Sequence, residues 1–254
     1  MEELAAQDSP VHRLHPLAKL LVAVGYILAV VSFPKYALTG LFAMLLYPVA
    51  LFQLSGIRVS TCFYKLRVIL PLVCAVGVAN PFLDRVVALR VGTVAVSGGV
   101  ISMLTLMLKG VLALMASFLL VATTRMDALC ASLRRLRVPG VLVTLLLLTY
   151  RYVGVLVDEV SAMSQAYALR APGQRGLHIS AWGSFLGQLL LRSMDRAQEL
   201  YSAMLLRGFH DHFHYVANPP FRRDSAVYMA TSAAFIALAR GVDLPRLLGG
   251  LFVR

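Results

Sequence analysis

Five apolar stretches lie along the chain, four of them in its first half. They cover residues 17–33, 36–54, 66–79, 98–124 and 226–239. A helix needs about 20 apolar residues to cross a bilayer, and the first, second and fourth stretches are close to or above that length. The third is shorter and contains Pro71, so we expect it to be broken, tilted or re-entrant. Asn-Pro and Gly-Gly steps predict a loop before the fourth stretch, and the path of residues 66–97 stays open.

The pattern changes between residues 125 and 225. A helical pattern begins at Pro139, a favoured first-turn residue, and continues to Arg170, where Pro172 and Gly173 stop it. Arg151 follows only about ten strongly apolar residues, and an arginine at the centre of a spanning helix costs about 2.5–3.5 kcal/mol. We therefore expect a helix of about 32 residues, or 48 Å, that leaves the bilayer and runs into the cytoplasm.

A second long helix is predicted over residues 181–207. Apolar residues recur from Trp182 to Leu205 with the i, i+3, i+4, i+7 spacing of an amphipathic helix. This stripe is expected to pack against residues 152–170. The opposite face is predicted to carry the polar residues Gln188, Arg192, Asp195, Glu199 and Ser202.

Composition supports a polytopic membrane protein, because 59% of the residues are hydrophobic and only 14% are charged. In such a chain the net charge of +12 fits cytoplasmic arginine and lysine better than nucleic-acid binding. Basic residues in the loops 55–67 and 125–137 place the N-terminus in the cytoplasm. The predicted fold is all-α, with about five membrane helices and a cytoplasmic coupling domain of long crossed amphipathic helices. The predicted order is a cytoplasmic tail (1–16), membrane helices 1–4 (17–124), the coupling domain (125–225), and a last membrane helix with a C-terminal tail (226–254).

The two long helices end in similar sequences. One reads AYALRA around Arg170 and the other AMLLRG around Arg207. Arg170 comes three residues after Tyr167 and Arg207 three residues after Met204, so each arginine lies at the end of its apolar stripe. Gly208 can adopt the left-handed conformation of a helix stop. A single arginine there is commonly a last-turn cation that faces the negative end of the helix dipole. Two matching ends favour the alternative, in which each arginine projects into a partner and binds carboxylates or carbonyls.

At this point the sequence resembles the transmembrane T component of energy-coupling factor (ECF) transporters, the EcfT/CbiQ type, over nearly its whole length. The segments that carry the resemblance are HPLAKL, NPFLDR, SGG, TTRMDALCASLRRLRVP, LLLLTYRYVGVLVDEV and AMLLRGF. The family motif near residue 15 usually begins Asp-Pro-Arg, where this chain has His15-Pro16-Leu17. The first helix end reads LRAPGQRG instead of the simpler Ala-Arg-Gly of the family, so Arg175 competes with Arg170 for the role of first coupling arginine.

The resemblance implies a coupling subunit in the bacterial inner membrane. Its partners would be two ABC-type ATPase subunits, a substrate-capture subunit and the lipid bilayer, with no nucleic acid. It would be non-catalytic and need no cofactor, and the sequence contains no GxxxxGK[ST] phosphate loop. The branch that looks most similar imports cobalt or nickel, which links the chain to cobalamin biosynthesis. The expected ATPase-coupling residues are Arg170, Arg207, Ala168, Ala171, Leu206 and Gly208, with Arg175, Arg151 and Lys109 as secondary candidates.

Several other hypotheses are weaker. His210, Asp211, His212 and His214 are metal-ligating types, but a loop after a helix end is the simpler interpretation. Lys109 is a functional candidate because intramembrane charges are costly, although it can instead reach between helices or snorkel. A membrane enzyme acting on lipid or prenyl substrates needs several carboxylates for magnesium diphosphate, and NPFLD offers Asp84 alone. A membrane scaffold without transport partners is the remaining alternative.

Overall fold

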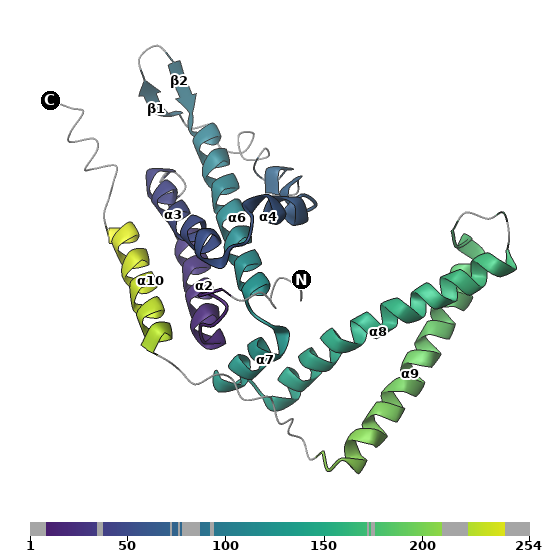
Figure 1. The fold of residues 1–254 in the computed structure, drawn as a ribbon. Helices are drawn as coiled ribbons and strands as arrows, with labels where there is room; N and C mark the ends of the chain where they lie inside the picture. Colours follow the sequence, from purple (N-terminus) through teal and green to yellow (C-terminus); the bar gives the residue numbers. More distant parts are fainter. Residues whose placement is uncertain are drawn as a thin grey trace. The chain divides into compact units, whose positions relative to one another are not determined.

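The structure is a computed structural model that describes residues 9–34, 38–71, 73–75, 77, 87–91, 94–171, 173, 176–209 and 223–241. These residues form an all-α membrane protein with one short β-hairpin (Figure 1). The helices of eight residues or more are α2 (Pro16–Val31), α3 (Leu38–Ser55), α4 (Val59–Leu66), α6 (Gly98–Thr123), α7 (Met126–Arg135), α8 (Gly140–Arg170), α9 (Trp182–Leu206) and α10 (Arg223–Gly241). The chain divides into two compact units, the first unit (residues 1–132 and 218–254) and the hairpin unit (residues 133–217).

Four of the five predicted apolar stretches correspond to α2, α3, α6 and α10, and part of the other, 66–79, lies outside the described residues. Two described helices are long and apolar enough to cross a membrane, α6 over Ile101–Thr123 and α8 over Gly140–Arg170. The number rises to three if α3 and α4, which meet at a bend of 113°, form one broken span. α2, with 16 residues, is a shorter apolar helix. The sequence predicted about five membrane helices.

Two segments differ from the predicted loops. The predicted loop 55–67 contains the helix α4, which ends in a basic last turn at Lys65. The predicted loop before α6 contains the antiparallel strands β1 (Val87–Val91) and β2 (Val94–Ser97), with Val91 opposite Val94. Each strand is rich in valine, a β-branched residue that favours extended backbone. The Asn-Pro and Gly-Gly steps marked the boundaries of this segment but did not reveal the hairpin between them.

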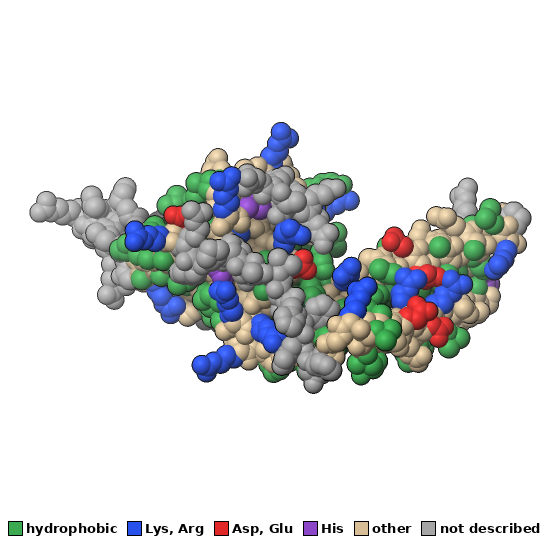
Figure 2. All heavy atoms as spheres, turned by 60° about the horizontal axis from the view of Figure 1, so that its bottom comes forward, with side chains coloured by type: hydrophobic (Ala, Val, Ile, Leu, Met, Phe, Trp, Pro, Cys, Tyr) green, Lys and Arg blue, Asp and Glu red, His purple; other side chains and the backbone are tan. Residues whose placement is uncertain are grey.

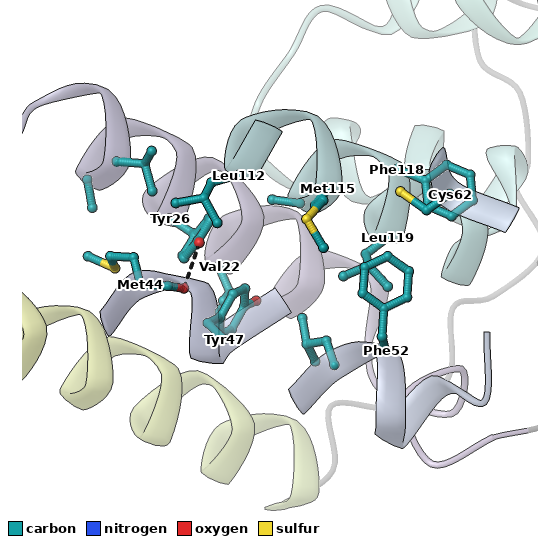
Figure 3. Close-up of a cluster of buried hydrophobic side chains, with 14 of the residues drawn as sticks. Val22, Tyr26, Met44, Tyr47, Phe52, Cys62, Leu112, Met115, Phe118 and Leu119 are labelled. Atoms are coloured by element: carbon teal, nitrogen blue, oxygen red, sulfur yellow. Dashed lines mark hydrogen bonds between the residues drawn. The ribbon is translucent and has the colours of Figure 1, made fainter. Parts of the chain in front are cut away.

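The core of the first unit lies where α2, α3, α6 and α10 pack together (Figure 3). It includes the fully buried side chains of Tyr26, Leu41, Met44 and Leu112. The rings of Tyr26 and Tyr47 stack with their centroids 4.6 Å apart, and the hydroxyl of Tyr47 lies 2.8 Å from that of Tyr228 on α10. Aromatic stacking and paired hydroxyls therefore connect three helices that are distant in sequence.

A tyrosine on α2 supplies the hydrogen bond that a proline inside α3 cannot donate. Pro48 lies in the interior of α3 and has no N–H, so the carbonyl of Met44, four residues earlier, loses its intrahelical donor. The Tyr26 hydroxyl donates a hydrogen bond of 2.9 Å to that Met44 carbonyl oxygen (Figure 3). The bend-prone site in α3 thus keeps its buried carbonyl satisfied through a neighbouring helix.

Two lysines join α2 and α6 at opposite ends. The Lys19 Nζ, on α2, donates to the carbonyl of Thr123, the last residue of α6, over 2.8 Å. The Lys109 Nζ, on α6, donates to the carbonyls of Val31, the last residue of α2, and of Phe33. Carbonyls at a helix C-terminus lack intrahelical partners and carry partial negative charge. Each helix therefore supplies the cation that caps the other, which gives Lys109 a structural role.

The hairpin unit consists mainly of α8 and α9, which run antiparallel from the connection between them (Figure 1). Glu159 of α8 accepts a hydrogen bond from Arg192 of α9 and lies 3.8 Å from Arg196. The placement of Arg192 on the face away from α8 was therefore wrong, because a long guanidinium side chain reaches across the helix pair to a carboxylate. Only part of the apolar stripe of α9 faces α8, since Phe185 is buried while Leu186 and Leu190 are 52% and 63% exposed.

Candidate functional site

The first candidate arginine stands at the end of α8. Arg170 is the last residue of the helix and its side chain is exposed. The helix ends at Ala171, whose N–H still donates to the Tyr167 carbonyl over 3.0 Å, while its own φ of −123° and ψ of 66° are no longer helical. Ala168 is also exposed, and Ala171, which follows Arg170, is half-buried. Arg175, its competitor, lies outside the described residues.

The second candidate arginine is held by a well-formed helix stop at the end of α9. Gly208 has a φ of +77°, the left-handed conformation expected for it. Its N–H donates to the Leu205 carbonyl over 2.9 Å, and the Phe209 N–H donates to the Met204 carbonyl over 3.0 Å. These two bonds around a left-handed residue are the Schellman motif. The motif places Arg207 at the cap of the helix, with its side chain exposed.

A leucine accompanies each arginine. Leu169 is 84% exposed and Leu206 is 90% exposed. Exposed apolar side chains are ordinary when scattered, but here the same Leu-Arg pair protrudes at the ends of both long helices. The guanidinium groups of Arg170 and Arg207 form no ion pair or hydrogen bond with another described residue. Each end therefore presents an apolar side chain beside an uncompensated cation, a combination that suits a pocket with an apolar floor and an acidic or carbonyl-lined rim.

The length of α9 separates the two ends. Trp182 begins α9 shortly after the end of α8, and Arg207 follows the last of its 25 residues. At 1.5 Å per residue α9 is about 37 Å long, and Arg170 and Arg207 line different grooves near its two ends. One small domain could not bind both ends in a single pocket, so the geometry provides two separate contact points.

Each arginine also lines a groove between the two helices. Arg170 lines one with Tyr167 and Gln188 near the connection. Arg207 lines a second, near the other end, with Arg151 of α8 and Arg196 of α9. Figure 2 shows basic and acidic side chains next to one another, among hydrophobic ones, on this unit. Arg151, a secondary candidate, is thus brought beside Arg207, whereas Lys109 belongs to the first unit and caps α2.

Metal-ligating groups are not gathered in the part of the chain that the structure describes, where no cluster of three or more His, Cys, Asp or Glu side chains could hold an ion. The segment with His210, Asp211, His212 and His214 lies outside that part. The described hairpin unit therefore offers contact surfaces and no ligand set.

Comparison with known proteins identifies the family of this chain. The model of the CbiQ family, described as cobalt transport proteins, matches residues 7–215. This chain belongs to the CbiQ family. It is 28% identical over 250 residues to the cobalt transport protein CbiQ of Rhodobacter capsulatus, covering 96% of this chain and 98% of that protein. It is also 28% identical over 229 residues to the ECF transporter transmembrane protein EcfT of Leuconostoc gelidum, covering 80% and 81% of the two chains.

A nickel permease, LarQ of Lactiplantibacillus plantarum, is 32% identical over a shorter region of 114 residues, or 45% of this chain and 41% of that protein. The resemblance deduced from the sequence motifs is therefore confirmed at the level of the family. As a CbiQ-family member, the chain is a membrane component of a transport system.

Sequence reasoning missed three features of this CbiQ-family hairpin unit. Leu169 was not selected although Leu206 was, and the matching LR pairs in the two helix ends were the available signal. Glu159 was not selected as a contact residue. The spacing of Arg192 and Arg196, four residues apart on one helix face, was the signal that both could reach one carboxylate.

Proposed function

We propose that the chain is the coupling subunit of an ATP-driven ECF-type importer. In this function Arg170 and Arg207, with their flanking residues Ala168, Ala171, Leu206 and Gly208, dock into two ABC-type ATPase subunits. A separate membrane subunit captures the substrate. Movement of the ATPases during their cycle would pass through α8 and α9 to that capture subunit. The chain itself would hydrolyse nothing.

The observation that carries this proposal is the repetition of an exposed Leu-Arg end near the two ends of α9, a helix about 37 Å long. A lone basic helix end is adequately explained by the helix dipole. The dipole does not explain a leucine that is 84% exposed at one end and another that is 90% exposed at the other, because exposure of a leucine costs free energy until a partner covers it. Two equivalent ends fit two equivalent partners.

We further propose that the hairpin unit lies against the cytoplasmic surface of the inner membrane. α8 is apolar enough to cross a bilayer, but its first half lines grooves with the second half of α9 and the residues that follow it, up to Phe209. α9 carries Arg192, Asp195, Arg196 and Glu199, whose burial in hydrocarbon would be costly. The two helices therefore belong at the interface, with apolar side chains toward lipid and charged ones toward water. We also propose a cytoplasmic N-terminus, because the basic residues of the segments 55–67 and 125–137 favour that orientation.

The transported substrate would be a divalent cobalt or nickel ion. The curated relatives named for these metals support this choice, and the described residues of this chain hold no ligand cluster of their own. Selection of the ion is therefore assigned to the capture subunit.

The test is co-purification of the chain with ATPase and capture subunits encoded beside it, together with metal uptake by cells. We expect Arg170→Ala and Arg207→Ala each to weaken assembly, and the double variant to lose both assembly and uptake. Arg58→Ala is the matched control, because Arg58 is an exposed arginine at the start of α4 in the first unit. Normal assembly and uptake in the double variant would refute the coupling role and favour a scaffold. Turnover of a lipid or prenyl substrate by the chain alone would favour the enzyme alternative.

A further inference from the structure

The groove beside Arg207 continues into an apolar one. The apolar groove lies between the first half of α8 and the second half of α9, and its walls include Val141, Leu145, Leu148, Leu200, Tyr201 and Met204. The charged groove that contains Arg151, Arg196 and Arg207 shares Leu148, Leu200, Met204 and Phe209 with it. The two form one continuous surface that is apolar at one end and basic at the other.

The basic end carries an excess of positive charge. Three arginines and a single carboxylate, Glu199, line it, so the formal charge is +3 − 1 = +2. Arg196 is partly compensated, because it lies 3.8 Å from Glu159. The guanidinium groups of Arg151 and Arg207 form no ion pair or hydrogen bond with a described residue. An anionic group at Arg151 would therefore be attracted without first displacing an existing partner.

The apolar end contains an unsatisfied hydroxyl. Thr144 lines this groove and is 8% exposed. Its Oγ1 is buried and has no hydrogen-bond partner among the described residues. A threonine in a helix commonly donates to the carbonyl four residues earlier, and this one does not. A ligand with a carbonyl acceptor would satisfy a group whose isolation costs free energy.

The change from apolar to basic follows the polarity expected across a membrane surface. Before Arg151, α8 exposes Val141, Leu142 and Leu145 at 61%, 57% and 55%. At the boundary Tyr150 and Tyr152 flank Arg151 in sequence, and tyrosine and arginine are both favoured at the headgroup level. An occupant that reaches both ends must have an apolar body, ester or amide carbonyls, and one anionic end.

We propose that this groove binds an anionic phospholipid. Its phosphate lies at Arg151, assisted by Arg196, and one acyl chain lies along the apolar walls formed by α8 and α9. An ester carbonyl accepts from Thr144. The proposal rests on the proposed function in one respect, the placement of the hairpin unit at the membrane surface. Arg207 stays available at the helix end for the protein partner, and the bound lipid anchors the hairpin unit at the membrane surface.

The experiment uses the full chain without ATPases, purified in a mild detergent and supplied with phosphatidylglycerol or phosphatidylcholine. Native mass spectrometry counts the lipids retained. We expect preferential retention of phosphatidylglycerol, and a loss of about fivefold in its affinity for Arg151→Gln, the factor that corresponds to about 1 kcal/mol per cation near an anionic lipid. The matched control Arg58→Gln removes the same charge from an exposed site outside the groove and should change little.

Two further arms identify the source of the binding. Leu145→Asn should lower retention of phosphatidylglycerol while leaving Arg151 in place, because it introduces a polar group into the acyl-chain wall. Inorganic phosphate at millimolar concentration should not displace the lipid. Displacement by phosphate, equal retention of both lipids, or unchanged affinity in Arg151→Gln would each overturn the proposal.

Failure of this proposal and failure of the coupling role are distinguishable. Lipid retention that depends on Arg151 would stand even if Arg207→Ala left ATPase assembly intact. If Arg151→Gln abolished ATPase co-purification and left lipid retention unchanged, the groove would instead be a site for an acidic protein segment. Thermal unfolding of each variant checks that the exposed Arg151 is not needed for folding.

Discussion

The hydrogen bond from Tyr26 to the Met44 carbonyl predicts that substitutions of Tyr26 on α2 and of Pro48 on α3 are energetically coupled. Tyr26→Phe removes the hydroxyl but keeps the ring stacked on Tyr47, whose centroid is 4.6 Å away. The lost interaction is therefore the 2.9 Å bond to the Met44 carbonyl. Met44 is fully buried, and Pro48 has no N–H that could replace the hydroxyl.

Two estimates bound the free-energy cost of Tyr26→Phe. A buried carbonyl left without a donor costs about 1–3 kcal/mol, whereas single hydrogen bonds between membrane helices average about 0.6 and reach about 1.7 kcal/mol. We expect Tyr26→Phe to lower the free energy of unfolding by about 1–1.5 kcal/mol. In a Pro48→Ala background the new Ala N–H can donate to Met44, so the same substitution should cost less than about 0.5 kcal/mol.

The assay is a double-mutant cycle measured by equilibrium unfolding in mixed micelles with increasing SDS. Far-UV circular dichroism reports loss of the helices, since the single tryptophan of the chain, Trp182, lies in the hairpin unit. Tyr64→Phe is the control, because Tyr64 is 69% exposed and should respond by less than about 0.5 kcal/mol. An equal cost of Tyr26→Phe in both backgrounds would refute the role assigned to Pro48.

Three further predictions concern stability and the pairing of α8 with α9. Gly208→Ala should destabilise the hairpin unit by about 1–2 kcal/mol, because φ is +77° there. Gly154→Ala, at an open position inside α8, should instead stabilise the unit by up to about 1 kcal/mol. Melting temperatures that shift in the same direction in both variants would contradict this prediction. Lys109→Met should lower the melting temperature by removing the cap of α2, and an unchanged melt would exclude the capping role. Glu159→Gln should broaden spin-label distances between α8 and α9, whereas the neighbouring Asp158→Asn should not; equal distributions in both would show that the ion pairs do not hold the crossing.

The sequence was informative where local chemistry decides the structure. Helix starts and stops near Pro139, Arg170 and Gly208 depend on residues within one turn, so their positions could be predicted. The partner of Lys109 could not, because the carbonyls of Val31 and Phe33 are 78 and 76 residues away in the chain. Such contacts depend on how helices pack, and periodicity states only that a face is apolar, not which side chain of a neighbour it meets.

The β-hairpin and the crossing of α8 and α9 illustrate the same limit. Strands β1 and β2 are short, and four or five valine-rich residues next to glycines give too little periodicity to separate a strand from a loop. At the crossing, Arg192 occupies a polar position on a helical wheel, which favours solvent when the helix is considered alone. Glu159 on the other helix changes the outcome, because a carboxylate within reach is a better partner for a guanidinium than water at a partly buried site.

The spacing of the two Leu-Arg ends depends mainly on α9. Arg170 is the last residue of α8, but it lines a groove with Ala181 and Ser184 at the start of α9, whereas Arg207 follows the last residue of α9. The length of α9 therefore sets most of the distance between the two arginines, and the angle between α8 and α9 has a smaller effect. Ion pairs from Glu159 can therefore loosen or tighten the crossing with little change in the separation of the two ends. Within the proposed function, this arrangement lets α8 move with a partner in the membrane while α9 keeps both ATPases at a nearly constant spacing.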